Sequence, residues 1–153
     1  DGSGEGPLLD LGFCVVRRLP LRGVAHPVNG EYVIRRGDRF ARVSCADGER
    51  HVYQAKLLRV IDGDTVRLRM DLGFDTFVEE TLRLRGVDAD EIDTPSGQKA
   101  RRALVRILPE AADITVYTYS HDRYGRYIAD LIVDDLYINR ALVEKGVARY
   151  LKM

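Results

Sequence analysis

The sequence predicts a mainly β fold of the α+β class, in which a five-stranded barrel with two helices follows a small N-terminal β-meander. Apolar and polar residues alternate strictly over 66–70, which is typical of a half-buried strand. Apolar residues recur at helical spacing over 100–108, and Pro109 directly follows this repeat. The connections between most elements have hairpin length, which favours a small closed barrel over a parallel sheet.

The first region covers residues 1–52 and contains short strand patterns separated by turn residues. Strands are expected at 31–36 and 39–45, with turns at 37–38 and 46–49. The Gly-rich opening at 1–7 is typical of a linker, as in an excised piece or processed product of a larger chain. Because no catalytic constellation occurs here, we interpret this region as an accessory segment, with a functional domain as the alternative.

The second region covers residues 53–153 and has sharper signals. A hairpin of strands at 54–61 and 66–70 is predicted around Asp62, Gly63 and Asp64, because Asp-Gly between apolar runs is a strong hairpin signal. Two later strands are predicted at about 113–119 and 127–133. Together with the strand described next, these five strands suit a barrel of the OB type.

A further strand of the barrel is expected from about Thr76 to Val87. Arg83 and Asp88 are five positions apart, so a flat strand would direct them to opposite faces. A site that uses both side chains therefore requires a bend or bulge between them. Gly86 lies between them and is the residue type that permits one.

Two helices are predicted. Thr94 supplies an N-cap and Pro95 the first helical position, and Pro109 ends the apolar repeat of this helix. The second helix is expected over 138–145, with Gly146 as its C-terminal cap.

Composition excludes several classes of protein. The 24 basic and 24 acidic side chains cancel, so the chain lacks the positive excess of a passive DNA-coating protein. Cys14, Cys45 and three dispersed histidines do not form a structural zinc pattern, and both a disulfide and free thiols remain open. No apolar run approaches the ~18 residues of a membrane span. Arginine outnumbers lysine 20 to 4, which fits either phosphate binding or genomic base composition.

Three polar segments could carry chemistry. They are Val60-Ile-Asp-Gly-Asp-Thr-Val66, Leu82-Arg-Leu-Arg-Gly-Val-Asp-Ala-Asp-Glu91 and Asp122-Arg-Tyr-Gly-Arg126. Each alone is explained as a solvated turn or hairpin tip. Together they place two acidic clusters and two arginines at strand ends, which are the groups that metal-assisted phosphodiester cleavage uses.

In this order and at these separations, the three segments resemble the signature stretches of the staphylococcal nuclease family. Asn139-Arg-Ala-Leu-Val-Glu-Lys-Gly146 also resembles the second helix of that family, and the similarity covers about residues 53–151. The resemblance implies an OB-type barrel and a calcium-dependent phosphodiesterase acting on DNA and RNA, which typically leaves 3′-phosphate ends. It also implies one Ca²⁺ ion, although an oxygen-only site accepts other divalent ions as well.

The resemblance also implies roles for individual residues. The metal ligands would be Asp64, Asp88 and the backbone carbonyl of Ala89, with Asp62 just behind them. Glu91 would orient or deprotonate the attacking water. The phosphate would be bound by Arg83 and Arg126, because guanidinium groups hold its nonbridging oxygens bidentately. The nucleotide would be flanked by Asp122, Arg123 and Tyr124, with Tyr124 available for stacking.

The sequence departs from the family pattern at two places. Asp90 stands where the family usually has proline, which we expect to loosen the turn and to add negative charge beside Glu91. The chain stops soon after the second helix, where family members commonly continue into a third. The alternatives to a nuclease are a noncatalytic module on the same barrel that binds nucleic acid or peptide, and a purely structural domain. The sequence implies no obligate protein partner and no membrane, and the resemblance to a largely secreted bacterial family is compatible with export.

Overall fold

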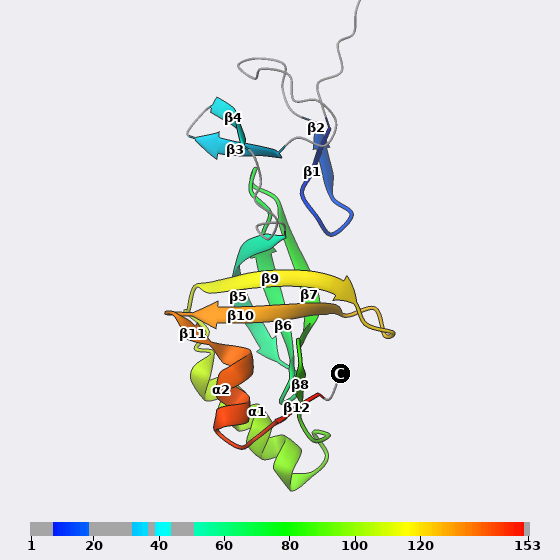
Figure 1. Cartoon of the computed structure of the whole chain (residues 1–153), viewed down its shortest axis with the longest axis vertical. Helices are drawn as coiled ribbons and strands as arrows, with labels where there is room; N and C mark the ends of the chain where they lie inside the picture. The colour runs from blue at the N-terminus through cyan, green and yellow to red at the C-terminus, as the bar shows by residue number, and fades with distance from the viewer. Residues whose placement is uncertain (1–7, 19–31, 37–38, 44–50, 152–153) are drawn as a thin grey trace, which may run out of the picture. The chain divides into compact units, whose positions relative to one another are not determined.

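A computed structural model describes residues 8–18, 32–36, 39–43 and 51–151 (Figure 1). The chain divides into two compact units, residues 1–50 and 51–153. The expected linker at 1–7, the turns at 37–38 and 46–49, and Cys45 lie outside the described residues. Cys14 is exposed and carries a free thiol.

The N-terminal unit contains two antiparallel hairpins. Strands β3 (Tyr32–Arg36) and β4 (Arg39–Val43) form the hairpin that the sequence predicts, with Tyr32 opposite Val43. Strands β1 (Leu8–Asp10) and β2 (Val16–Arg18) form a second hairpin. The sequence analysis did not predict this second hairpin, because strands of three residues are too short to show alternation.

The second unit is a closed five-stranded barrel. It is built from β5 (Val52–Val60), β6 (Thr65–Asp71), β7 (Phe77–Leu84), β9 (Ile114–His121) and β10 (Tyr127–Val133). The strand order is β10-β7-β6-β5-β9, and pairing of β9 with β10 closes the ring. Only the β7–β10 pair is parallel among these described pairs. The predicted mainly β, OB-type fold is confirmed.

The alternation of apolar and polar residues determines which side chains point into the barrel and which point outward. On β6 the side chains of Val66, Leu68 and Met70 are fully buried, whereas Arg67 and Arg69 are exposed. Burial of each such aliphatic side chain contributes about 1.5–3 kcal/mol, so the register of this strand is strongly specified.

The chain bends after β7, as the positions of Arg83 and Asp88 require. The strand ends at Leu84, Gly86 has a positive φ of 69°, and the short strand β8 (Val87–Asp88) follows. Strand β12 (Arg149–Tyr150) pairs with β8, placing Arg149 opposite Asp88. The last described residues of the chain thereby reach the segment that carries Asp88.

Two helices pack at one end of the barrel (Figure 1). Helix α1 (Pro95–Ile107) begins at the predicted N-cap, where the Thr94 hydroxyl accepts the N–H of Gly97 at 3.0 Å. Its buried face includes Ala100 and Leu104. Helix α2 (Ile138–Glu144) follows the short strand β11 (Leu136–Tyr137). Within the described residues, neither helix has the length and apolar character needed to cross a membrane.

Candidate functional site

A polar cleft of about 350 Å³ lies where the β5–β6 turn, the segment after β7 and the β9–β10 turn meet. The structure brings together in this cleft every residue that the sequence singled out for chemistry. The cleft is lined by Asp62, Asp64, Arg83, Asp88, Ala89, Asp90, Glu91, Asp122, Arg123, Tyr124 and Arg126. Three segments that are far apart in the chain therefore form one site.

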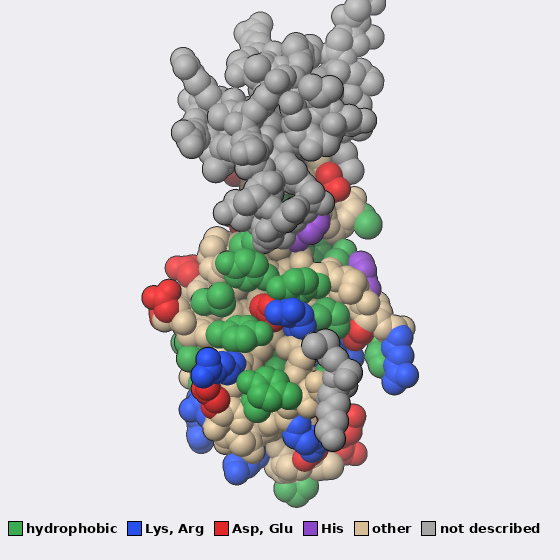
Figure 2. All heavy atoms as spheres, viewed as in Figure 1, with side chains coloured by type: hydrophobic (Ala, Val, Ile, Leu, Met, Phe, Trp, Pro, Cys, Tyr) green, Lys and Arg blue, Asp and Glu red, His purple; other side chains and the backbone are tan. Residues whose placement is uncertain are grey.

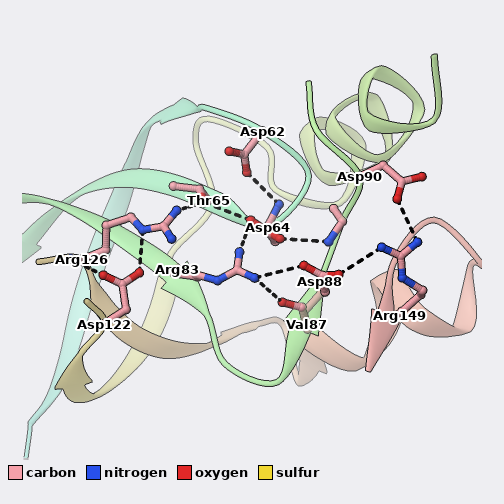
Figure 3. Close-up of polar contacts among 11 residues, drawn as sticks. Asp62, Asp64, Thr65, Arg83, Val87, Asp88, Asp90, Asp122, Arg126 and Arg149 are labelled. Carbon is pink, nitrogen blue, oxygen red and sulfur yellow. Dashed lines mark hydrogen bonds and ion pairs between the residues drawn. The ribbon is translucent and has the colours of Figure 1, made fainter. Parts of the chain in front are cut away.

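Two carboxylates of the cleft converge on one guanidinium group (Figure 3). Arg83 forms an ion pair with Asp64 through Nη1, and its Nη2 lies 3.4 Å from Asp88 Oδ1. Arg83 Nη2 also donates to the carbonyl of Val87 at 3.1 Å. The bend at Gly86 makes this arrangement possible, because it turns the Asp88 side chain back toward the end of β7.

Asp64 is buried and fully engaged. Its Oδ1 accepts the hydroxyl of Thr65 at 3.0 Å, and its Oδ2 accepts the N–H of Ala89 at 2.9 Å. Burial acts to raise the pKa of Asp64, but the Ala89 N–H and the Arg83 guanidinium outweigh it and hold that pKa below its ordinary value. Asp64 therefore carries a full negative charge at neutral pH.

Asp62 contacts the backbone of Asp64. Its Oδ1 accepts the N–H of Asp64 at 3.1 Å, closing the turn between β5 and β6. Burial raises the pKa of Asp62, and the charge of Asp64 adds to the rise despite that hydrogen bond. The environment thus pushes the pKa values of these two acids in opposite directions.

Glu91 is exposed, and its position is fixed through the backbone. Its carbonyl oxygen accepts the N–H of Thr94 at 3.0 Å and the Thr94 hydroxyl at 2.7 Å. The first turn of α1 lies so close that a Cβ on Gly97 would fall 1.9 Å from that same carbonyl oxygen. Glycine at position 97 is therefore what allows the helix to hold the Glu91 segment at the cleft.

The β9–β10 turn holds the second arginine. Asp122 Oδ1 accepts the N–H groups of Tyr124 at 2.8 Å and Arg126 at 3.0 Å, and its Oδ2 accepts Arg126 Nε at 2.7 Å. Burial acts to raise the pKa of Asp122, but the hydrogen bonds from Arg126 and Tyr124 outweigh it and hold that pKa below its ordinary value. Tyr124 is 68% exposed, and the guanidinium carbons of Arg123 and Arg126 lie 4.8 and 5.4 Å from its ring centre.

Arg149 is a site residue that the sequence analysis missed. Its Nη2 donates to Asp88 Oδ2 at 3.0 Å and its Nη1 to Asp90 Oδ1 at 2.8 Å (Figure 3). Arg149 therefore offsets the negative charge that Asp90 adds beside Glu91, whereas the loosening of the turn stays a prediction. No local signal links residues about 60 positions apart; the only available hint was an unassigned arginine in the last segment of the chain.

Thr65 is the second missed residue. Its hydroxyl donates to Asp64 and accepts a hydrogen bond from Arg126 Nη1 at 3.2 Å. It thereby connects the two arginines through a continuous chain of hydrogen bonds. Its place directly after Asp64 in the quoted motif was the signal that could have identified it.

The donor set of the cleft suits a hard divalent cation. Carboxylate and carbonyl oxygens are the ligands that Ca²⁺ takes in proteins. Among the described residues, no three His, Cys, Asp or Glu side chains form a metal cluster by themselves. A cation would thus take two carboxylates and complete its shell with backbone oxygen, water or substrate.

Comparisons with known proteins find similar sequences, each over part of this chain. Residues 81–153 match the family model described as staphylococcal nuclease homologue. The probable staphylococcal-like nuclease CAN1 of Oryza sativa subsp. japonica is 37% identical over 67 residues, which are 44% of this chain and 20% of that protein. An uncharacterized endonuclease of Escherichia coli O157:H7 is 28% identical over 107 residues, 69% of this chain and 63% of that protein.

Fold and site together define a small OB-type barrel with a cleft of carboxylates and arginines. Over residues 81–153 the chain is similar to the staphylococcal nuclease family. It spans about a fifth of the length of the plant relatives that it matches.

Proposed function

We propose that this domain is a metal-dependent nuclease that hydrolyses phosphodiester bonds of DNA or RNA, with Ca²⁺ as the first candidate ion. The observation that carries the proposal is one cleft that contains Asp64, Asp88, Glu91 and two arginines. The names of the relatives support the reaction class, since they are called nucleases or endonucleases.

Charge in the cleft supports the need for a cation. Its lining has six acidic and three basic side chains, an excess of three negative charges that would repel a polyanionic substrate. Asp64 and Asp88, with the carbonyl of Ala89, would hold the ion. When bound, a divalent ion polarises a phosphate oxygen and lowers the pKa of a coordinated water.

Glu91 is proposed as the group that orients or deprotonates the attacking water. Its carboxylate is exposed at the cleft, and in the described part of the chain it forms no ion pair that would divert it. A positioned general base contributes about 10²–10⁴-fold to such a reaction.

Arg83 and Arg126 are proposed to bind the phosphate. Arg126 uses Nε and Nη1 on Asp122 and Thr65, and its Nη2 has no partner among the described residues. Arg83 Nε is likewise uncommitted within the described chain. Guanidinium groups are suited to binding phosphate oxygens, and Arg126 could also stabilise the departing 5′-oxygen.

The test is cleavage of denatured DNA and of RNA in calcium, in chelator, and with Glu91→Gln. Glu110→Gln is the matched control, because Glu110 is exposed outside the cleft. We expect calcium-dependent cleavage that falls at least 10²-fold in Glu91→Gln and is unchanged in Glu110→Gln.

The rival function is a noncatalytic module that binds nucleic acid or peptide. One observation favours it: Arg83 and Arg149 both form ion pairs with Asp88 and offset the charge that would bind a metal. Folded wild-type protein that binds nucleic acid in chelator but leaves it intact in calcium would replace the nuclease proposal with this one.

A further inference from the structure

The outer surface of β9 and β10 carries planar side chains beside the cleft. Along β9, inward residues are buried and the outward series ends with exposed Tyr119 and His121. Tyr127 lies opposite His121 in the register of the two strands. In the space-filling view, hydrophobic side chains gather over β9 and β10 around a basic and an acidic group (Figure 2).

These side chains form two stacks. The guanidinium carbon of Arg85 lies 4.5 Å from the ring centre of Tyr119, which is 45% exposed. The rings of His121 and Tyr127 lie 3.8 Å apart at an interplanar angle of 44°. Tyr119 and His121 are two residues apart on one strand, so the stacks are spaced by about 7 Å.

A buried carboxylate fixes the first stack. Asp130 accepts Arg85 Nε at 3.0 Å and Nη2 at 2.6 Å, and also the hydroxyl of Tyr119 at 2.8 Å. The hydroxyl of Tyr137 donates to the same carboxylate at 2.9 Å. Because Arg85 and Tyr119 are already held in place, a planar ligand stacking on them would lose little side-chain entropy.

The two stacks continue directly from the cleft. His121 precedes Asp122 and Tyr127 follows Arg126, and Asp122 and Arg126 both line the cleft. The outer surface offers flat faces rather than a row of cations, since the charge of Arg85 is balanced by Asp130. Flat, half-exposed faces of this kind bind nucleobases by stacking, with little dependence on sequence.

We propose that the β9–β10 platform, defined as Arg85, Tyr119, His121 and Tyr127, binds successive bases of a single-stranded nucleic acid whose phosphate occupies the cleft. This inference rests on the proposed function and adds to it a second binding surface, which would contact the bases that lie beyond the cleft. Paired bases present no open faces to such a platform, so duplex substrate would bind only through the cleft.

The test measures binding by the full chain carrying Glu91→Gln in Ca²⁺, because a cation would offset the negative charge of the cleft and this substitution suppresses cleavage. The probes are a fluorescein-labelled thymidine dinucleotide and an oligothymidylate of about twelve nucleotides, within the range that one OB-type barrel covers. We expect tighter binding of the longer probe. Tyr119→Leu and His121→Ala should each weaken that binding about tenfold and leave the dinucleotide unaffected.

Two control variants sharpen the comparison. Phe77→Ala removes a similar exposed stack, in which Arg69 lies 4.5 Å from the Phe77 ring, at the opposite end of β7 from Arg83. It should not change binding. Tyr119→Phe keeps the ring and loses the bond to Asp130, so it should retain the length preference and separates stacking from folding defects.

Equal affinity for the two probes, or unchanged binding of the longer probe in folded Tyr119→Leu and His121→Ala, would overturn the platform. Calcium-dependent cleavage by the wild-type chain is measured in parallel. A length preference that depends on Tyr119 in a protein that never cleaves would support the platform and refute only the nuclease function.

Discussion

Replacing Gly97 by alanine tests how the cleft is assembled. The added Cβ would lie 1.9 Å from the carbonyl oxygen of Glu91 and 2.6 Å from that of Asp90. Ordinary contact begins at 3.4 Å, so the first turn of α1 and the Glu91 segment must separate by about 1.5 Å. Both oxygens belong to the backbone, which cannot rotate away as a side chain would.

The size of the effect follows from three contributions. Forcing a methyl group into a packed contact costs about 1–3 kcal/mol, and weakening the Thr94 cap adds about 1 kcal/mol. Alanine recovers up to about 1 kcal/mol through its helix propensity. We therefore expect Gly97→Ala to lower the free energy of unfolding by about 1–3 kcal/mol. Under the proposed mechanism, a shift of 1 Å or more at Glu91 should lower kcat about 10²-fold.

Urea denaturation and calcium-dependent cleavage measure the two effects separately. Gln98→Ala is the control, because Gln98 is the exposed neighbour on the same helix and does not line the cleft. A Gly97→Ala protein with the stability and cleavage rate of the wild type would refute the close approach of α1 to Glu91.

Three further predictions concern the polar groups. Asp130→Ala leaves the hydroxyls of Tyr119 and Tyr137 without their acceptor, so urea denaturation should show a loss of about 2–4 kcal/mol. This loss of stability is smaller than that expected for a fully buried ion pair, because the Arg85 side chain is half exposed. A measured loss under about 0.5 kcal/mol would contradict the prediction. Burial and the Asp130 carboxylate raise the pKa of Tyr137 to about 12, so its contribution is complete below pH 10 and is lost as the pH rises through about 12. Tyr137→Phe should flatten that alkaline decline in stability; an unchanged curve would exclude Tyr137 as its source. Arg149→Gln removes a positive charge 3.0 Å from Asp88 and should tighten calcium binding, measured by calorimetry, about two- to fivefold, whereas Lys145→Gln should not. Weaker binding in Arg149→Gln would show that Arg149 orients Asp88 rather than competing for it.

The sequence predicted what depends on neighbouring residues. Alternation on β6, the Thr94 cap and the Asp-Gly turn each need only a few adjacent positions, and all three occur in the structure. The bend at Gly86 could also be predicted, because strand parity makes it a geometric condition for Arg83 and Asp88 to share a site.

The sequence could not predict contacts that depend on closure of the barrel. Arg149 meets Asp88 only because β12 pairs with β8, and Asp130 meets Arg85 only because β10 lies beside β7. From the sequence alone, Asp130 would be predicted to be an ordinary solvated residue on the outer face of its strand. Its burial follows from Arg85 and two tyrosines that cover it, which no local pattern indicates.

The cleft joins its parts through one hydrogen-bonded chain, and this has a consequence for how its arginines act. Asp64 binds Arg83 on one side and the Thr65 hydroxyl on the other, and Thr65 accepts Arg126, which is held by Asp122 (Figure 3). Under the proposed mechanism, a cation bound to the Asp64 carboxylate would compete with Arg83 for it. The Arg83 guanidinium would then be released to donate to a phosphate, while Asp122 keeps Arg126 in place. Metal and phosphate binding are therefore expected to reinforce each other, because each uses a partner that the other releases.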